Sequence, residues 1–141
     1  MNTTMIRRSF PLILGTAVVA WSSTAFAVCL NGHPSRKQEY QRSTTVFVGP
    51  VVSEDFTPES KDYENGTTYS IQVEEVLRGS PAKTVKVFSE NDSGRFPMQV
   101  GTAYLIFVYE ELDRLKVDNC GNSGKLSEKA EALAALRKMK R

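Results

Sequence analysis

The chain has 141 residues, of which 40% are hydrophobic and 24% charged, and its formal net charge is +2 at pH 7. This composition is that of an ordinary globular protein with enough apolar residues for one core. A charge so close to zero argues against the basic surface that nucleic-acid binding requires, so no nucleic-acid partner is expected.

Residues 1–27 have the parts of a secretory signal peptide. Two arginines and no acidic residue stand at the start, an apolar run covers residues 11–21, and the segment ends in Ala25-Phe26-Ala27. The apolar run is shorter than the roughly 20 residues that a membrane anchor needs. We therefore expect cleavage after Ala27 and no membrane anchor.

The route of export stays open, because Arg7-Arg8 partly matches a twin-arginine signal as well as a general one. Val28 stands before Cys29 where a lipoprotein would have a small residue, which argues against lipidation. The expected mature protein is a single domain, residues 28–141, that is secreted or periplasmic. Its 16 basic residues would balance its 16 acidic ones, since Arg7 and Arg8 leave with the signal.

Both cysteines, Cys29 and Cys120, lie in the expected mature part. In an oxidising compartment, two cysteines in one exported chain are most simply a disulfide. A reactive thiol or a metal site are the alternatives. A metal site has few ligands available, since His33 is the only histidine and no Cys-x-x-Cys occurs.

The mature chain begins with a polar stretch, residues 28–42, that we interpret as extended coil. Residues 44–52 are β-branched and aromatic and predict a strand. Gly49-Pro50 lies inside that strand and predicts a sharp bend or bulge. An acidic loop over residues 53–66 should follow.

Four further strands are predicted. Residues 67–77 alternate between apolar and polar side chains, residues 84–89 form a short strand, and residues 115–118 form the last one. Residues 102–109 are apolar on both faces and should be the most buried strand.

The pattern changes to a helical period after the strands. Ser127 can serve as the N-cap, and apolar side chains recur every three or four residues at Leu126, Ala130, Leu133, Leu136 and Met139. Five strands and this helix predict a mainly β fold with a C-terminal α-helix, in the form of a small antiparallel barrel.

The sequence offers little for catalysis. Glu74 and Glu75 are neighbours in a predicted strand, so they would point to opposite faces. A single histidine cannot define a triad, and no Gly-x-Ser-x-Gly motif occurs. We expect a binding protein that is not an enzyme and has no cofactor or bound metal.

Several short motifs recur in the order and spacing of a known family. They are CLNGHP from Cys29, VFVGPVV from Val46, YSIQVEEVLRG from Tyr69, GTAYLIF from Gly101 and NCG from Asn119. Together they resemble the netrin-like module of tissue inhibitors of metalloproteinases (TIMPs), in an abbreviated bacterial form. The likeness covers most of the mature chain.

The resemblance implies a five-stranded OB-fold barrel in which Cys29–Cys120 ties the N-terminal segment to the last strand. It also implies a binding site at Val28, Cys29 and Leu30, where the family inserts its N-terminus as a wedge. The implied partner is an exported protein, in the family's own case a zinc metalloprotease, and the chain should be a monomer.

One departure from the family concerns the wedge itself. The inhibitors begin Cys-x-Cys, and the α-amino and carbonyl groups of the first cysteine chelate the protease zinc. Here Ala27 stands in the place of that first cysteine. Val28 would therefore be the N-terminal residue without a disulfide of its own. A barrel that binds an oligosaccharide or another extracytoplasmic ligand is the alternative function, because this fold hosts several kinds of ligand.

Overall fold

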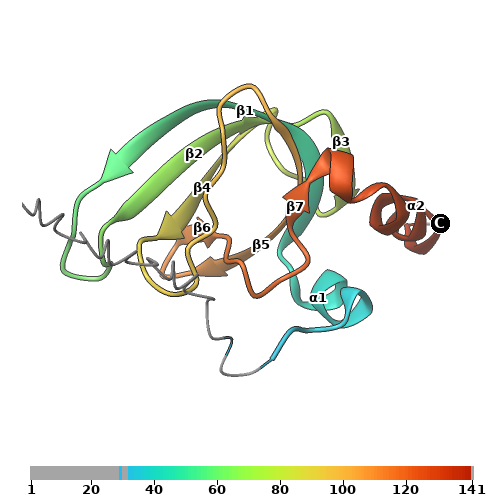
Figure 1. Cartoon of the computed structure of the whole chain (residues 1–141), viewed down its shortest axis with the longest axis horizontal. Helices are drawn as coiled ribbons and strands as arrows, with labels where there is room; N and C mark the ends of the chain where they lie inside the picture. The colour runs from blue at the N-terminus through green and yellow to red at the C-terminus, as the bar shows by residue number, and fades with distance from the viewer. Residues whose placement is uncertain (1–28, 30–31, 141) are drawn as a thin grey trace, which may run out of the picture.

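A computed structural model describes residue 29 and residues 32–140 of the chain (Figure 1). The expected signal peptide, Val28 and Leu30 lie outside the described residues. The protein is mainly β with a short C-terminal helix, as predicted. Its elements are α1 (Arg36–Arg42), β1 (Thr45–Thr57), β2 (Gly66–Gln72), β3 (Glu75–Arg78), β4 (Thr84–Glu90), β5 (Ala103–Glu111), β6 (Arg114–Lys116), β7 (Gly124–Lys125), the 3-10 helix η1 (Leu126–Glu128) and α2 (Ala130–Met139).

Five strands close into a ring in the order β1, β2, β4, β6, β5 and back to β1. All neighbours in this ring are antiparallel except β4 and β6, which meet in one parallel pair, Phe88 with Lys116. β3 pairs with the first half of β1, and β7 pairs with β5. The five strands expected from the sequence contribute the five members of the ring.

Apolar side chains form two separate clusters, one on each side of β5. Tyr104, Ile106 and Val108 belong to the first cluster, which also takes side chains from β1, β2 and β4. Leu105 and Phe107 belong to the second, with Leu133 and Leu136 of α2. These five β5 side chains are at most 2% exposed, which confirms the prediction that both faces of this strand are buried.

β1 changes its neighbours along its length. Val46–Val48 pair with β3, whereas the strand pairs with β2 from Val51 onward, and the register shifts between Val51 and Ser53. The predicted irregularity is therefore present, just after Gly49-Pro50. A Cβ at Gly49 would lie 1.9 Å from the carbonyl oxygen of Gln72, so this close approach requires glycine. The strand continues to Thr57, so the loop expected from residue 53 begins later.

The expectation of extended coil over residues 28–42 is wrong for α1. Ser35 caps this helix: its Oγ accepts a hydrogen bond from the backbone N–H of Gln38 at 3.3 Å, and the Gln38 side chain accepts one from the Ser35 N–H at 3.1 Å. This reciprocal pair is a capping box, which satisfies backbone donors at the helix start. The Tyr40 hydroxyl then donates to the carbonyl oxygen of Leu77 at 2.8 Å and fixes the helix beside β3.

Two further boundaries differ from the expectation. The strand predicted over residues 67–77 is divided into β2 and β3, because the N–H groups of Val73 and Glu74 donate to Lys83 and Val48. Glu74 therefore lies outside both strands. Ser127 is not the N-cap of the C-terminal helix: it lies in η1, and α2 begins after Lys129 without a side-chain cap. Among the described residues, no helix is long and apolar enough to cross a membrane.

Candidate functional site

The N-terminal segment is fastened to the segment that follows β6. Cys29 and Cys120 form a disulfide with their Cα atoms 5.6 Å apart, across a sequence separation of 91 residues, which confirms the predicted bridge. Nδ1 of His33 lies 3.0 Å from the carbonyl oxygen of Cys120, so it is the ring nitrogen that donates in this hydrogen bond. A covalent bond and a hydrogen bond thus converge on one residue.

Asn122 makes a second attachment close to the first. Its side-chain nitrogen donates to the carbonyl oxygen of Pro34 at 3.1 Å and to Oε2 of Glu39 at 2.5 Å. Its backbone N–H donates to the same Glu39 oxygen at 2.6 Å. A Cβ at Gly121 would lie 2.1 Å from Oε1 of Glu39, so the carboxylate sits directly against the backbone there. We call the disulfide and these hydrogen bonds of His33 and Asn122 the N-terminal clasp.

Burial raises the pKa of Glu39 above its usual value. The hydrogen bonds from Asn122 act in the opposite direction, because they stabilise the charged form, but they do not outweigh the loss of water. The negative charge of Asp118 adds to the rise. The clasp therefore contains a carboxyl group whose charged form is disfavoured.

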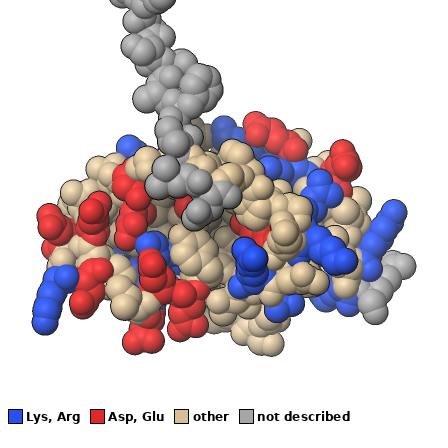
Figure 2. All heavy atoms as spheres, turned by 90° about the horizontal axis from the view of Figure 1, so that it is seen from below, with Lys and Arg blue, Asp and Glu red and all other residues tan. Residues whose placement is uncertain are grey.

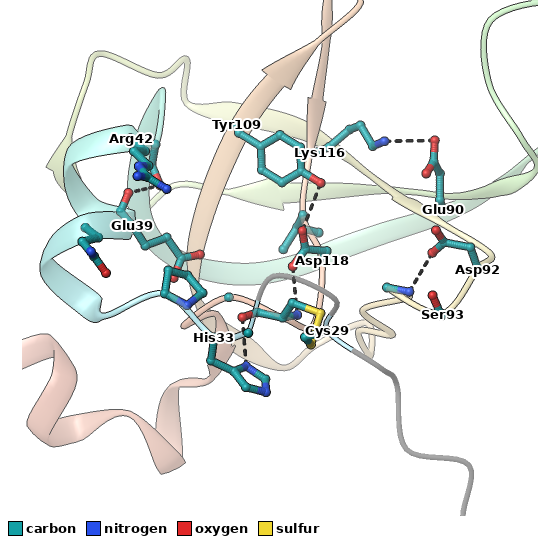
Figure 3. A pocket seen from close by; sticks show the side chains of 18 residues that line it. Cys29, His33, Glu39, Arg42, Glu90, Asp92, Ser93, Tyr109, Lys116 and Asp118 are labelled. Carbon is teal, nitrogen blue, oxygen red and sulfur yellow. Dashed lines mark hydrogen bonds and ion pairs between the residues drawn. A yellow bond between two sulfur atoms is a disulfide. The ribbon is translucent and has the colours of Figure 1, made fainter.

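A cleft of about 740 Å³ lies beside the clasp (Figure 3). Its walls come from the N-terminal segment with α1, from the loop after β4, and from the chain between β5 and Gly121. The charged side chains that line it are Glu39, Arg42, Glu90, Asp92, Lys116 and Asp118. Cys29 and His33 stand at its edge, so the clasp forms part of the wall.

Tyr109 and Asp118 are joined inside this cleft. The Tyr109 hydroxyl donates to Oδ2 of Asp118 at 3.2 Å, and the backbone N–H of Cys120 donates to Oδ1 at 2.8 Å. Burial raises the pKa of the Tyr109 phenol well above its usual value, and the Asp118 charge raises it further. Tyr109 therefore acts as a hydrogen-bond donor and stays neutral.

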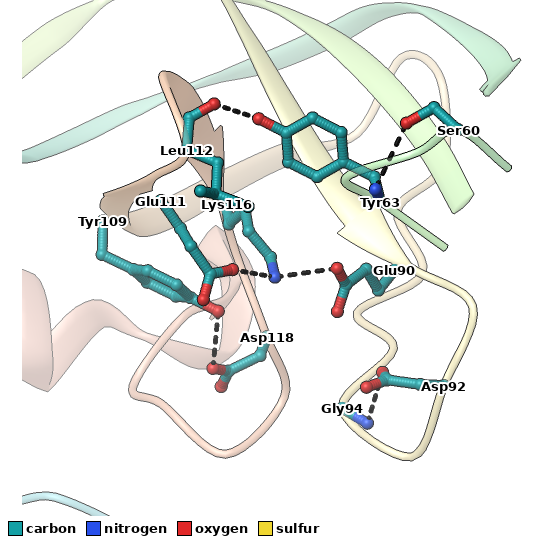
Figure 4. Close-up of polar contacts among 10 residues, drawn as sticks. All are labelled: Ser60, Tyr63, Glu90, Asp92, Gly94, Tyr109, Glu111, Leu112, Lys116 and Asp118. Atoms are coloured by element: carbon teal, nitrogen blue, oxygen red, sulfur yellow. Dashed lines mark hydrogen bonds and ion pairs between the residues drawn. The ribbon is translucent and has the colours of Figure 1, made fainter. Parts of the chain in front are cut away.

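Lys116 joins two acidic side chains at the other wall (Figure 4). Its Nζ lies 3.0 Å from Oε1 of Glu90 and also contacts Oε2 of Glu111. Burial lowers the pKa of Lys116, but hydrogen bonds to the two carboxylates outweigh it, and the net pKa is raised. The ammonium group is thus held in its charged form between β4 and β5.

The carboxylates that line the cleft are hydrogen-bonded or ion-paired within the protein. Each carboxylate in its wall has a donor within the protein: Asn122 for Glu39, Lys116 for Glu90, the Gly94 N–H for Asp92 and the Tyr109 hydroxyl for Asp118. Within the part of the chain that the structure describes, no cluster of three metal-ligating side chains occurs. The polar groups therefore serve first to hold the walls together.

Of the three residues that the resemblance implies for the N-terminal wedge, Val28, Cys29 and Leu30, the structure describes only Cys29. It is half-buried at the edge of the cleft. Sequence reasoning did not find Glu39, Tyr109 or Asp118. Glu39 lies 70 or more positions before the other two residues, and only the fold brings them to one cleft. No local motif marks such a meeting. The Ser-x-x-Gln cap of α1 was the one local signal that could have placed Glu39 on a helix.

A scan against protein-family models and a search of curated proteins each found no match. The likeness to TIMPs thus rests on the motifs of this sequence alone.

Proposed function

We propose that this chain is an exported, non-catalytic protein-binding module of the netrin/TIMP-like type, built on an OB-fold barrel. The N-terminal clasp is the observation that carries the proposal. It holds Cys29, one of the three residues that the resemblance implies for binding, against the segment after β6. The ring of five strands supports the architecture, because an OB-fold is a five-stranded Greek-key barrel.

The clasp gives a physical basis for binding at the N-terminus. After cleavage behind Ala27, Val28 would be the first residue and would stand next to a half-cystine whose position is fixed. A fixed anchor lowers the conformational entropy that a binding segment loses when it docks. The α-amino nitrogen and the carbonyl oxygen of Val28 are the groups that could ligate a protease zinc. The family's first cysteine is missing here, so the proposal is protein binding in general. Zinc chelation by Val28 is a narrower version of it that is tested separately.

The test is a titration of zinc metalloproteases with protein that begins at Val28, beside a version that retains Ala27. The extra residue acylates the Val28 nitrogen and removes it as a ligand, while every described contact stays the same. Inhibition by the first protein alone would support the wedge at Val28, Cys29 and Leu30. Equal inhibition by both, or by neither, would exclude the chelating mechanism. Capture of a defined exported partner by the immobilised domain would then decide the broader proposal.

The cleft favours one second candidate, the binding of an oligosaccharide or another small extracytoplasmic ligand. Its volume of about 740 Å³ lies within the range of small-molecule sites. Tyr109 and the surrounding carboxylates supply hydrogen-bonding groups for hydroxyls. A panel of oligosaccharides titrated by NMR should then shift amide signals around Asp118 and Gly94. Shifts confined to other surfaces, or none, would exclude this candidate.

A further inference from the structure

Among the described strands, residues 53–57 of β1 have a neighbour on only one side. Thr45–Pro50 pair with β5, and Val51 exchanges hydrogen bonds with the chain at Gly101 and Thr102. From Ser53 to Thr57 the strand pairs with β2, and among the described strands none pairs with its other edge. Figure 1 shows this end of β1 running along the outside of the molecule with β2 on its inner side. We call residues 53–57 the open edge.

The open edge is regular and accessible. Its residues pair in continuous register with Gly66 to Ser70, the register shift precedes it, and Pro58 follows it. Glu54, Asp55 and Phe56 are all exposed, and 70% of the Phe56 surface is accessible. A strand edge of this kind presents unpaired N–H and C=O groups to which another extended chain can add. Phe56 supplies an apolar contact for such a chain.

The open edge and the loop that follows it carry mostly acidic charge. Glu54 and Asp55 lie on it, and the loop that follows adds Glu59, Asp62 and Glu64 against a single Lys61. Figure 2 shows the molecule from below, the face away from the outer side of β1; on this face too, acidic side chains gather toward the end where the β1–β2 hairpin lies, and most basic ones lie toward the other end. Opposite charges across neighbouring strands attract, and like charges repel.

We propose that the open edge docks an extended, basic segment of a partner protein, which adds to β1 as a further strand. Because side chains alternate along a strand, Glu54 and Phe56 would share one face and Asp55 the other. The complementary segment carries an apolar residue opposite Phe56 and lysine or arginine opposite Glu54 and Asp55. A second copy of this chain is disfavoured, because it would bring Glu54 and Asp55 of both copies together. The proposal goes beyond the N-terminal wedge and requires neither a free Val28 nor zinc.

The experiment titrates protein spanning residues 28–141 with a fluorescent synthetic peptide of high strand propensity, centred on Val-Lys-Lys. Four comparison peptides are used. One has Val-Glu-Glu and one the reversed order Lys-Lys-Val. The other two keep Val-Lys-Lys and carry N-methyl groups on one or the other set of alternate backbone nitrogens. We expect saturable binding of the lysine peptides in one or both orders. The Val-Glu-Glu peptide should bind about tenfold or more weakly than the Val-Lys-Lys peptide. One of the two methylated peptides should lose affinity to a similar extent and the other should not, because only alternate N–H groups of an added strand point toward β1.

Protein variants separate strand addition from general attraction of charge. The double variant Glu54→Lys, Asp55→Lys should bind the lysine peptide more weakly and the glutamate peptide more tightly than the parent protein does. The matched control is Glu59→Lys with Asp62→Lys, which makes the same change of charge at exposed positions of the neighbouring loop. It should reduce binding much less. Thermal melting of each variant verifies that it is folded.

Amide hydrogen exchange supplies the direct measurement. Bound lysine peptide should slow exchange within residues 53–57, while exchange near Cys120 stays unchanged. Absence of binding, equal binding of both methylated peptides, or equal loss in both protein variants would each overturn the proposal. Retaining Ala27 should leave this binding unchanged, so failure here and failure of the wedge are distinguishable.

Discussion

At the scale of single residues, Glu39 shows how a side chain can serve the fold at an electrostatic cost. Its carboxylate accepts two hydrogen bonds from Asn122 and lies against Gly121, and these contacts join α1 to the segment that carries Cys120. Burial nevertheless raises its pKa, so the folded protein favours the protonated form. The folded protein is therefore less stable relative to the unfolded chain when Glu39 is charged, because the loss of water costs more than the hydrogen bonds from Asn122 recover.

This balance predicts a pH dependence that Glu39→Gln removes. A group whose pKa is raised on folding stabilises the protein below its unfolded pKa, near 4.5, and loses that contribution as pH rises through the folded value. The stability of the Gln variant relative to the parent should therefore increase with pH above about 4.5 and then level off. Urea denaturation across this range measures it. A relative stability that decreases as pH rises would contradict the assignment.

At the scale of elements, β1 changes its neighbouring strands next to Gly49, where another backbone segment lies too close for any side chain. It pairs with β3 over Val46–Val48 and with β5 as far as Pro50, and it pairs with β2 from Val51 onward. The backbone of Gln72 approaches Gly49 so closely that no side chain fits between them. Gln72 is the last residue of β2, so this close approach lies at the end of that strand.

Gly49→Ala should accordingly destabilise the protein by about 1–3 kcal/mol, since a methyl group would push apart two backbone segments that pairing holds in place. Gly94→Ala is the matched control. The nearest atom to a Cβ at Gly94 is the Asp92 Oδ1 at 3.3 Å, at the end of a side chain in an exposed loop. Denaturation midpoints of the two variants should differ clearly. Equal stability would show that β1 can shift at this point without loss.

Prediction from sequence also succeeded unevenly at this scale. Residues 102–109 were identified as buried on both faces because their apolar character is continuous, and β5 does separate the two clusters. α1 was missed because Gly32, Pro34 and several charges outweighed the short Ser-x-x-Gln signal. Ser127 was chosen as a cap from its type alone, whereas the chain first makes a turn of 3-10 helix.

At the scale of the whole molecule, the disulfide joins Cys29, at the start of the described chain, to Cys120, which lies between β6 and β7. Its sequence separation of 91 residues means that it restricts the unfolded chain strongly. Neither Cys29 nor Cys120 belongs to either cluster. The bridge should therefore add stability without being needed for the fold.

Replacing both cysteines by alanine should leave a folded protein that is less stable by a few kcal/mol, with about 4–5 kcal/mol as the upper figure from chain entropy. Guanidinium denaturation followed by circular dichroism measures the loss. Intact mass of the exported parent protein provides the companion observation: it should begin at Val28 and contain no alkylatable thiol until reduced. Unchanged stability of the variant would contradict the role given to the bridge.

The sequence by itself determined the mainly β class, the strands of the ring and the burial of β5, because each follows from the type and alternation of neighbouring side chains. It also determined the pairing of Cys29 with Cys120, since no other cysteine is present. Only the tertiary structure decided the closure of the ring, the clasp, the cleft and the open edge. These depend on contacts between segments distant in the chain, such as Glu39 with Asn122, and on which strand edge is left without a neighbour. Neither is a property of any short stretch of sequence.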